Sequence, residues 1–247
     1  MARKATTALV AFFLGTGLSA GAQAQDIKLY AFSSGALTIG KGVLQNNAPM
    51  TPEIQVPVGF FVVTHPKGNV LFDTGNNDKI ITDPSYWGDA FKELKPVNTP
   101  DVAIDTQLQK IGLKPDDIKY VVVSHLHLDH GGNVAKFPNS TLVVQKSEIQ
   151  NAFWPAPGTG GPYMIGDLMT VRLKNRGLTI LTGDNVYFRE NVEKNLPPNI
   201  VLAYSPSGIL SAYEWIRYQM ATEKADFFTA HDPDAFKAMK KAPEFYD

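Results

Sequence analysis

The amino-acid sequence predicts an α/β protein, because short apolar segments of strand character alternate with segments of helical periodicity along 247 residues. Hydrophobic residues make up 44% and charged residues 19% of the chain, which is the composition of a folded protein with a sizeable core. The length suits one large domain or two small ones. We expect a single domain, because no stretch of the sequence separates two halves as a linker would.

The first part of the folded region is rich in strand signals. Residues Tyr30–Ile39 alternate loosely between apolar and polar side chains and predict a strand with a turn at Ser33–Gly35. Two further apolar runs, Val56–Val63 and Val70–Phe72, flank a turn with proline and glycine, so they predict a hairpin. Residues 76–99 show no clear period, and we expect irregular structure there.

A helix and further strands are predicted in the middle of the chain. Ile104, Leu108 and Ile111 recur at helical spacing, so residues 102–111 predict an amphipathic helix that Gly112 ends. The β-branched run that follows predicts a strand buried on both faces. The other elements expected in this region are that strand at residues 118–123, a strand at 142–144 and a helix at 147–153.

The last third of the chain repeats this alternation. A helix is expected at residues 207–220, with apolar residues at Leu210, Tyr213, Trp215 and Ile216. Earlier in the chain, a Pro/Gly-rich stretch at 154–162 predicts a loop, either over the mouth of a site or on an inert surface. The elements expected here are a buried strand at residues 178–182, the helix at 207–220 and a strand at 227–230.

Residues 1–24 have the pattern of a cleavable secretory signal. Two basic residues near the start form a positive head, an apolar run follows from Ala5 to Leu18, and Ala22-Gln23-Ala24 supplies the small residues of a cleavage site. The apolar run is shorter than the roughly 20 residues that span a bilayer, which argues against the alternative of a membrane anchor. We therefore expect an exported protein, periplasmic or secreted, with no membrane association after cleavage and a folded domain at residues 25–247.

Charge and cysteine content exclude several classes of function. The chain has 23 Lys and Arg residues against 24 Asp and Glu residues, so it lacks the dense basic surface of a nucleic-acid binder, and we expect no nucleic-acid partner. It has no cysteine, which excludes disulfides, iron–sulfur ligation, cysteine-ligated zinc and cysteine nucleophiles together.

Three of the five histidines, His125, His127 and His130, lie within six residues and follow directly on an expected strand. Ligands bind at strand ends in α/β proteins. His125 and His127 project to the same side of an extended segment, whereas Asp129 and His130 come after a turn and can face a second point. Imidazole and carboxylate ligands suit zinc, with iron or manganese as alternatives, so we expect one or two zinc ions here.

The run His125-Leu126-His127-Leu128-Asp129-His130 resembles the HxHxDH motif of the metallo-β-lactamase superfamily. Nearly all of the mature chain resembles the N-acyl homoserine lactonase family within that superfamily. The resemblance implies an αβ/βα sandwich, in which two mixed β-sheets are flanked by helices and the metals lie at one edge between the sheets.

The resemblance also implies roles for residues outside the cluster. Asp73 lies in a loop similar to the family's Asp-Thr-Gly loop and would orient a ligand histidine. Asp184 would bridge the two metals, and His231 would be a late ligand of the second metal. Tyr187 lies where lactonases place a tyrosine that contacts the substrate carbonyl, with a packed core tyrosine as the alternative. The implied metal ligands are His125, His127, Asp129, His130, Asp184 and His231.

The family's Thr-Pro-Gly-His-like loop, which carries a further ligand histidine, has no counterpart in this chain. No histidine lies between His130 and His231, and the interval from His130 to Asp184 is short for the family. We infer a deletion near Asp167–Leu168, either a real feature or a fault in the gene model, that removes at least a strand and this loop. The first metal would keep His125, His127 and Asp184, and three protein ligands still suit a catalytic zinc.

The function that the resemblance implies is a zinc-dependent hydrolase whose metal-bound hydroxide opens the ring of an N-acyl homoserine lactone or a related lactone. Asp129 would relay a proton to the leaving alcohol, and Tyr187 would help to stabilise the oxyanion. The expected partner is therefore a small-molecule lactone or ester. The alternatives are a thioesterase or β-lactam hydrolase of the same fold, and a non-catalytic zinc-binding protein that has lost one ligand.

Overall fold

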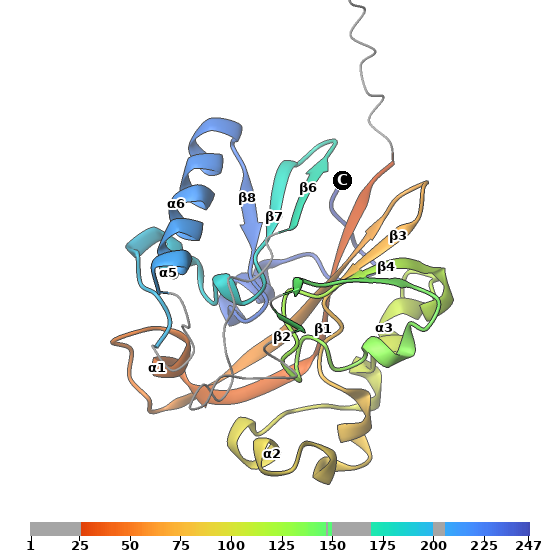
Figure 1. Ribbon diagram of the computed structural model, residues 1–247, viewed down its shortest axis with the longest axis horizontal. Coiled ribbons are helices and arrows are strands. Elements are labelled where there is room, and N and C mark those ends of the chain that lie inside the picture. Colours follow the sequence, from red (N-terminus) through yellow and green to blue (C-terminus); the bar gives the residue numbers. More distant parts are fainter. Residues whose placement is uncertain (1–25, 147, 150–168, 200–205) are drawn as a thin grey trace, which may run out of the picture.

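The computed structural model describes residues 26–146, 148–149, 169–199 and 206–247. The expected signal at 1–24, the loop at 154–162 and the inferred deletion at Asp167–Leu168 lie outside the described residues, as does most of the helix expected at 147–153. Within the described residues, the chain forms two β-sheets that face each other, with helices on their outer sides (Figure 1). The α/β class and the two mixed sheets expected from the sequence are confirmed.

The described strands and α-helices have the following bounds, in chain order. The strands are β1 (Lys28–Gly40), β2 (Glu53–Thr64), β3 (Asn69–Phe72), β4 (Ile118–Val122), β5 (Thr141–Val143), β6 (Met169–Leu173), β7 (Gly177–Leu181) and β8 (Asp226–Phe228). The helices are α1 (Lys41–Leu44), α2 (Asp89–Leu94), α3 (Ile104–Gln109), α5 (Arg189–Lys194), α6 (Pro206–Glu223) and α7 (Pro233–Ala238).

The larger sheet has the strand order β1-β2-β3-β4-β5. β1, β2 and β3 pair antiparallel, and β3, β4 and β5 pair parallel. The expected hairpin is confirmed as β2 and β3. The turn expected at Ser33–Gly35 is wrong, because β1 continues through it with a shift of register, which Gly35 accommodates at a φ of +111°.

The smaller sheet, β6-β7-β8, packs face to face against the larger one. Phe61 and Phe72 of the larger sheet share a core with Leu181 and Phe228 of the smaller sheet, and the rings of Phe61 and Phe228 stack with centroids 5.9 Å apart. Apolar burial between the two sheets therefore holds the halves of the chain together.

The outer face of each sheet is covered by one of the amphipathic helices that the sequence predicts. Ile104 and Leu108 of α3 pack on the larger sheet, and Tyr213 and Ile216 of α6 pack on the smaller one. Figure 1 shows α3 and α6 on opposite sides of the pair of sheets, which gives the expected αβ/βα order of layers. No helix among the described residues combines the length and the apolar character needed to cross a membrane.

Three local expectations differ from the structure. The strand at 118–123 is not buried on both faces, because β4 lies beside the three-residue edge strand β5 and Tyr120 is left 36% exposed. Trp215 is also partly exposed, on the outer side of α6. Residues 76–99 contain α2 and two short 3₁₀ helices at 78–81 and 84–87, which are too short to show a helical period in sequence.

Four strands end at the same edge of the sandwich, and this edge carries the chemistry expected from the sequence. Asp73 follows β3, the histidine cluster follows β4, Asp184 comes soon after β7, and His231 comes soon after β8. Because β3 and β4 are parallel neighbours, as are β7 and β8, the carboxyl ends of each pair lie together.

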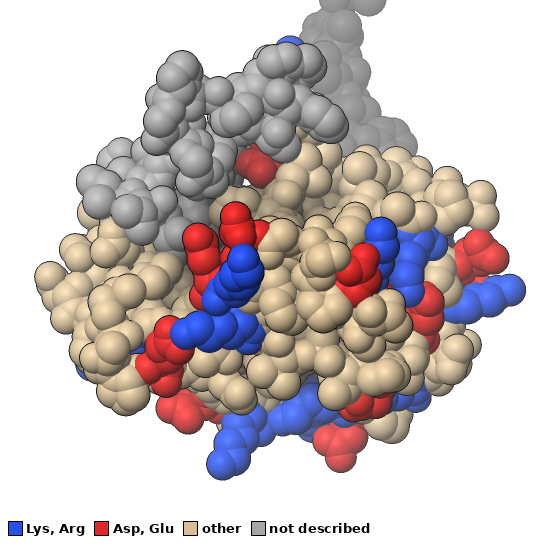
Figure 2. Space-filling model, turned by 90° about the horizontal axis from the view of Figure 1, so that it is seen from below, with Lys and Arg blue, Asp and Glu red and all other residues tan. Residues whose placement is uncertain are grey.

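On the face drawn in Figure 2, the basic and acidic side chains in colour are interspersed rather than gathered by sign.

Candidate metal centre

The histidine cluster lies in a tight loop after β4. The N–H groups of His130 and Gly131 both donate to the carbonyl of His127, at 3.1 and 2.8 Å, so the chain turns between His127 and His130. Gly132 then packs against the loop after β3, where a Cβ would lie 2.5 Å from the amide nitrogen of Asn77. Only glycine allows the two loops to approach this closely.

The six expected ligand residues converge in two groups. The ligand atoms of His125, His127 and Asp184 lie within 4.8 Å of one another, and so do those of Asp129, His130 and His231. We call these the first group and the second group. The structure thus brings together residues from the loops after β4, β7 and β8.

Asp184 lies between the two groups. Its Oδ1 is 3.0 Å from Nε2 of His130 and 3.0 Å from Nε2 of His231, whereas its Oδ2 is 3.7 Å from Nε2 of His125. One carboxylate therefore faces both groups, which is the geometry expected of a bridging ligand. Asp129 lies on the other side, with Oδ2 at 3.6 Å from Nε2 of His130 and 3.8 Å from Nε2 of His231.

The histidines of the second group are held with Nε2 facing inward. Nδ1 of His130 donates to Oδ2 of Asp73 at 2.9 Å, and Nδ1 of His231 donates to the carbonyl of Pro57 at 2.7 Å. The two Nε2 atoms face each other at 3.2 Å. Two imidazole lone pairs and a carboxylate at this distance repel one another unless a proton or a cation lies between them, so the donor set fits a divalent metal such as zinc.

Asp73 connects the two loops beneath the candidate centre. It is 1% exposed, and its backbone has a φ of +58°, a strained conformation for a residue with a side chain. The backbone N–H and hydroxyl of Ser124 donate to its two carboxylate oxygens at 2.7 and 2.8 Å. Asp73 thereby holds the start of the histidine loop as well as the ring of His130.

Burial and the clustered charges shift the pKa values of the site strongly when no metal is bound. Burial lowers the pKa of His130, but the carboxylates of Asp184, Asp129 and Asp73 outweigh it and raise that pKa well above its usual value. His231 behaves in the same way, and Asp184 dominates among the carboxylates that raise its pKa. Burial also opposes ionisation of Asp184, yet the neighbouring histidines bring its pKa well below the usual range. A bound cation would take the place of these protons.

His125 differs from the histidines of the second group. Its burial, together with repulsion from the neighbouring imidazoles, that of His130 above all, brings its pKa well below the usual value. A neutral imidazole is the form that ligates a metal, so His125 needs no proton removed before it binds.

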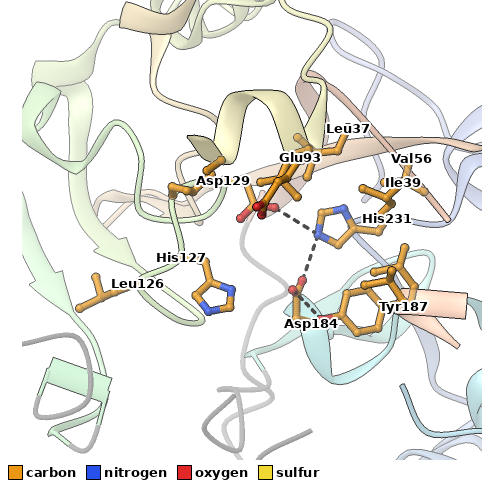
Figure 3. A pocket seen from close by; sticks show the side chains of 15 residues that line it. Leu37, Ile39, Val56, Glu93, Leu126, His127, Asp129, Asp184, Tyr187 and His231 are labelled. Carbon is orange, nitrogen blue, oxygen red and sulfur yellow. Dashed lines mark hydrogen bonds and ion pairs between the residues drawn. The ribbon is translucent and has the colours of Figure 1, made fainter. Parts of the chain in front are cut away.

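A cavity of about 550 Å³ opens onto the candidate centre (Figure 3). His127, Asp184 and His231 line its floor, and Tyr187 lies beside them with its hydroxyl donating to Oδ2 of Asp184 at 3.0 Å. Tyr187 is both packed in an apolar core and bonded to the site. The walls are largely apolar and include Leu37, Ile39, Val43, Leu44, Val56 and Leu94.

Three features of the site were not predicted from the sequence. Glu93 of α2 lines the cavity, in a region for which we expected only irregular structure. Ser124 contacts Asp73 and also lies with Oγ 3.1 Å from Nδ1 of His125; its place directly before the first histidine was the available signal. Glu148 is buried beside the histidine loop, and no pattern in the sequence marks it.

Comparison with known proteins identifies similar chains. Residues 55–167 match the family model of the "Metallo-beta-lactamase superfamily". The chain is 31% identical over 263 residues to the N-acyl homoserine lactonase AttM of Azorhizobium caulinodans, and 32% identical over 262 residues to AttM of Rhizobium radiobacter. Each alignment covers 90% of this chain and 99% of the relative. The N-acyl homoserine lactonase AiiA of Bacillus thuringiensis subsp. kurstaki is 25% identical, with coverage of 88% and 98%.

A solved structure shows the same fold. It is an N-acyl homoserine lactone hydrolase with the product N-hexanoyl-L-homoserine bound at its catalytic metal center. It superposes with a TM-score of 0.75 at 24% identity, over 88% of this chain and 98% of that chain.

Proposed function

Because the chain belongs to the metallo-beta-lactamase superfamily, and within it to the family formed by the N-acyl homoserine lactonases, we propose that it is a zinc-dependent hydrolase that opens the ring of N-acyl homoserine lactones. One observation supports this most directly. The carboxylate of Asp184 lies between the two groups of histidine and aspartate side chains, at the floor of a largely apolar cavity. The relatives named above are N-acyl homoserine lactonases, and the alignments cover 98–99% of their length. This favours a lactone substrate over a thioester or a β-lactam.

The residues fit two zinc ions with unequal ligand sets. His125, His127 and Asp184 would hold the first, and Asp129, His130, Asp184 and His231 the second. Zinc bound there would supply Lewis acidity and lower the pKa of a water molecule toward neutrality. Among the described residues, the first site has three candidate protein ligands, and His65, the one histidine outside the two groups, lies in the turn between β2 and β3.

The other residues of the cavity would orient the substrate and move the protons. The apolar walls suit an acyl chain, with the ring carbonyl placed above Asp184. The Tyr187 hydroxyl would turn from Oδ2 of Asp184 to the carbonyl oxygen and donate to it as negative charge develops there. Asp129, whose side chain lines the cavity, would carry a proton to the leaving alkoxide of the opened ring.

We also propose that this chemistry takes place outside the cytoplasm, after cleavage behind Ala24. The support is the sequence pattern of residues 1–24 alone. The mass of the mature chain, isolated from the periplasm or the medium, should correspond to an N-terminus at Gln25. A secreted chain that still carries Met1 would contradict the proposal.

The test of the lactonase is hydrolysis of N-hexanoyl homoserine lactone by the mature chain, followed by proton release in weak buffer. We expect slow turnover that rises as zinc is added, because the described residues offer the first site three protein ligands. Asp184→Asn should abolish turnover, since Oδ1 faces the second group and Oδ2 the first, and the change replaces one of these two oxygens with an amide nitrogen. Tyr187→Phe should lower kcat roughly 100-fold with little change in KM, which is the cost of one oxyanion donor.

Substrate controls separate the remaining candidates. An acyl thioester and a cephalosporin are tested in parallel with the lactone at the same zinc concentration. Turnover of either one above that of the lactone would move the assignment to that class. A chain that binds zinc but leaves all three intact would be a non-catalytic zinc-binding protein.

A further inference from the structure

A buried carboxylate holds the peptide between the two histidines of the first group. Glu148 is 3% exposed, and its Oε1 accepts a hydrogen bond from the backbone N–H of Leu126 at 2.8 Å. Its Oε2 is also buried and has no hydrogen-bond partner among the described residues. A buried carboxylate with one free oxygen is costly unless positive charge nearby compensates it. The adjacent first group would supply that charge when it binds a metal.

The position of Leu126 decides where both imidazoles lie. Leu126 separates His125 from His127 in a stretch that belongs to no strand or helix, so no sheet ladder fixes its N–H. The two rings are close, with centroids 4.4 Å apart and planes at 70°. Figure 3 shows Leu126 and His127 pointing to opposite sides of the loop. A shift of the peptide would therefore move the ligand atoms of the first group.

The two groups have different support from the protein. His130 and His231 donate from Nδ1 to Asp73 and to the carbonyl of Pro57, both on strands or at a strand end. In the first group, Oγ of Ser124 lies 3.1 Å from Nδ1 of His125. The bond from Leu126 to Glu148 adds to it from a segment far along the chain.

We propose that Glu148 is a positioning residue for the first metal. Its Oε1 fixes the Leu126 peptide and thereby sets His125 and His127 at ligand distance, and its charge adds to the attraction for a cation. This support carries more weight because the described residues offer three protein ligands for the first site, and His65, the one histidine outside the two groups, lies in the turn after β2. The inference rests on the proposed function only in treating the two groups as metal sites.

The test uses the full mature chain with Glu148→Ala and Glu148→Gln. Zinc affinities are measured by competition with a chromophoric chelator, and the first site is followed by the absorption spectrum of bound cobalt(II). We expect Glu148→Ala to lower the affinity for the more weakly bound zinc, which we assign to the first site, roughly 10- to 100-fold. Mutations of other residues that orient a metal ligand have effects of this size. The affinity for the more tightly bound zinc should change less than about threefold. Glu148→Gln keeps an oxygen that can accept from Leu126, so it should recover much of the weaker affinity and the cobalt spectrum.

The matched control is Glu223→Ala, which removes a glutamate bonded to Arg172 on an exposed surface. It should leave both zinc affinities unchanged. The proposal is overturned if Glu148→Ala lowers the melting temperature but not the weaker zinc affinity, if it lowers both affinities equally, or if Glu148→Gln is as weak as Glu148→Ala. A wild-type chain that binds at most one zinc also overturns it. Because zinc binding is measured without hydrolysis, a chain that binds two zinc ions but opens no lactone refutes the proposed function alone.

Discussion

Asp73 is the residue whose replacement should disturb the second group most selectively. Its two carboxylate oxygens accept from the N–H and hydroxyl of Ser124 and from Nδ1 of His130, at 2.7, 2.8 and 2.9 Å. Asp73→Asn is the informative change, because asparagine has the same size and tolerates the φ of +58° better than alanine does. The variant therefore alters charge and hydrogen bonding without adding backbone strain.

The expected magnitude follows from the donors that share Oδ2. If the asparagine oxygen keeps the bond to the Ser124 N–H, its amide nitrogen faces the Ser124 hydroxyl and Nδ1 of His130. Nδ1 must then accept, which moves the ring proton to Nε2 and blocks that atom from binding a metal. Hydrogen bonds to a charged group are worth about 1.5–3 kcal/mol and neutral ones about 0.5–1.5 kcal/mol, so the loss of charge on the two bonds that share Oδ2 costs about 2–3 kcal/mol.

Two measurements test this account of Asp73. Urea unfolding in the presence of EDTA should show that the free energy of unfolding of the metal-free chain falls by about 2–3 kcal/mol. Chelator competition should show at least a tenfold loss of affinity for the tighter zinc. The control is Asp78→Asn, another largely buried aspartate, which accepts from the Ile104 N–H and from Lys136. It should cost stability but leave zinc affinity within about twofold. If Asp73→Asn behaves like this control, Asp73 does not set the tautomer of His130.

Gly132→Ala should lower both the melting temperature and the zinc content, because the new Cβ would lie 2.5 Å from the Asn77 nitrogen; wild-type values would contradict the close packing of the two loops. Hydrogen bonds and charges from Lys41 and Lys194 lower the pKa of Glu190 below its usual 4.5, so its carboxylate stabilises the fold above that pH and the effect is lost as pH falls through the folded pKa. Glu190→Gln should therefore cost up to about 1 kcal/mol at pH 7 and nothing in strongly acid solution, and a urea-unfolding difference that is independent of pH would refute this. A family-like strand and histidine loop inserted between residues 167 and 168 should raise lactone turnover more than the same insert with alanine for its histidine; equal gains would show that the insert acts only through folding.

Local sequence patterns predicted the parts of the fold that depend on local forces. The hairpin of β2 and β3 and the spacing of Ile104 and Leu108 each lie within a dozen or so residues, and the structure agrees with both. The HxHxDH cluster is equally local, because its turn comes from hydrogen bonds to the carbonyl of His127. Asp184 and His231 were different, since no spacing within the chain linked them to the cluster and only the family resemblance did. The structure supplies the physical link through the parallel pairing of β7 with β8.

Properties that depend on the order of strands could not be predicted from a segment alone. The β-branched run in β4 has the composition of a fully buried strand, yet Tyr120 is partly exposed because the sheet ends one short strand further on. The same holds for Leu142, which is 44% exposed on that edge strand. Burial of a strand is decided by its neighbours, and these are distant in sequence.

The two groups of the candidate centre are positioned by different parts of the fold. The second group is held by Asp73 and Pro57, which belong to the larger sheet or follow it directly, so its geometry is fixed wherever that sheet is folded. The first group depends on an irregular loop, on Asp184 and on the contact of Glu148 with Leu126. Metal binding at such a site is coupled to the structure of the loop that carries the ligands. Zinc supply should therefore act on this chain chiefly through the first group, and the affinity of that group should set the zinc concentration at which turnover begins.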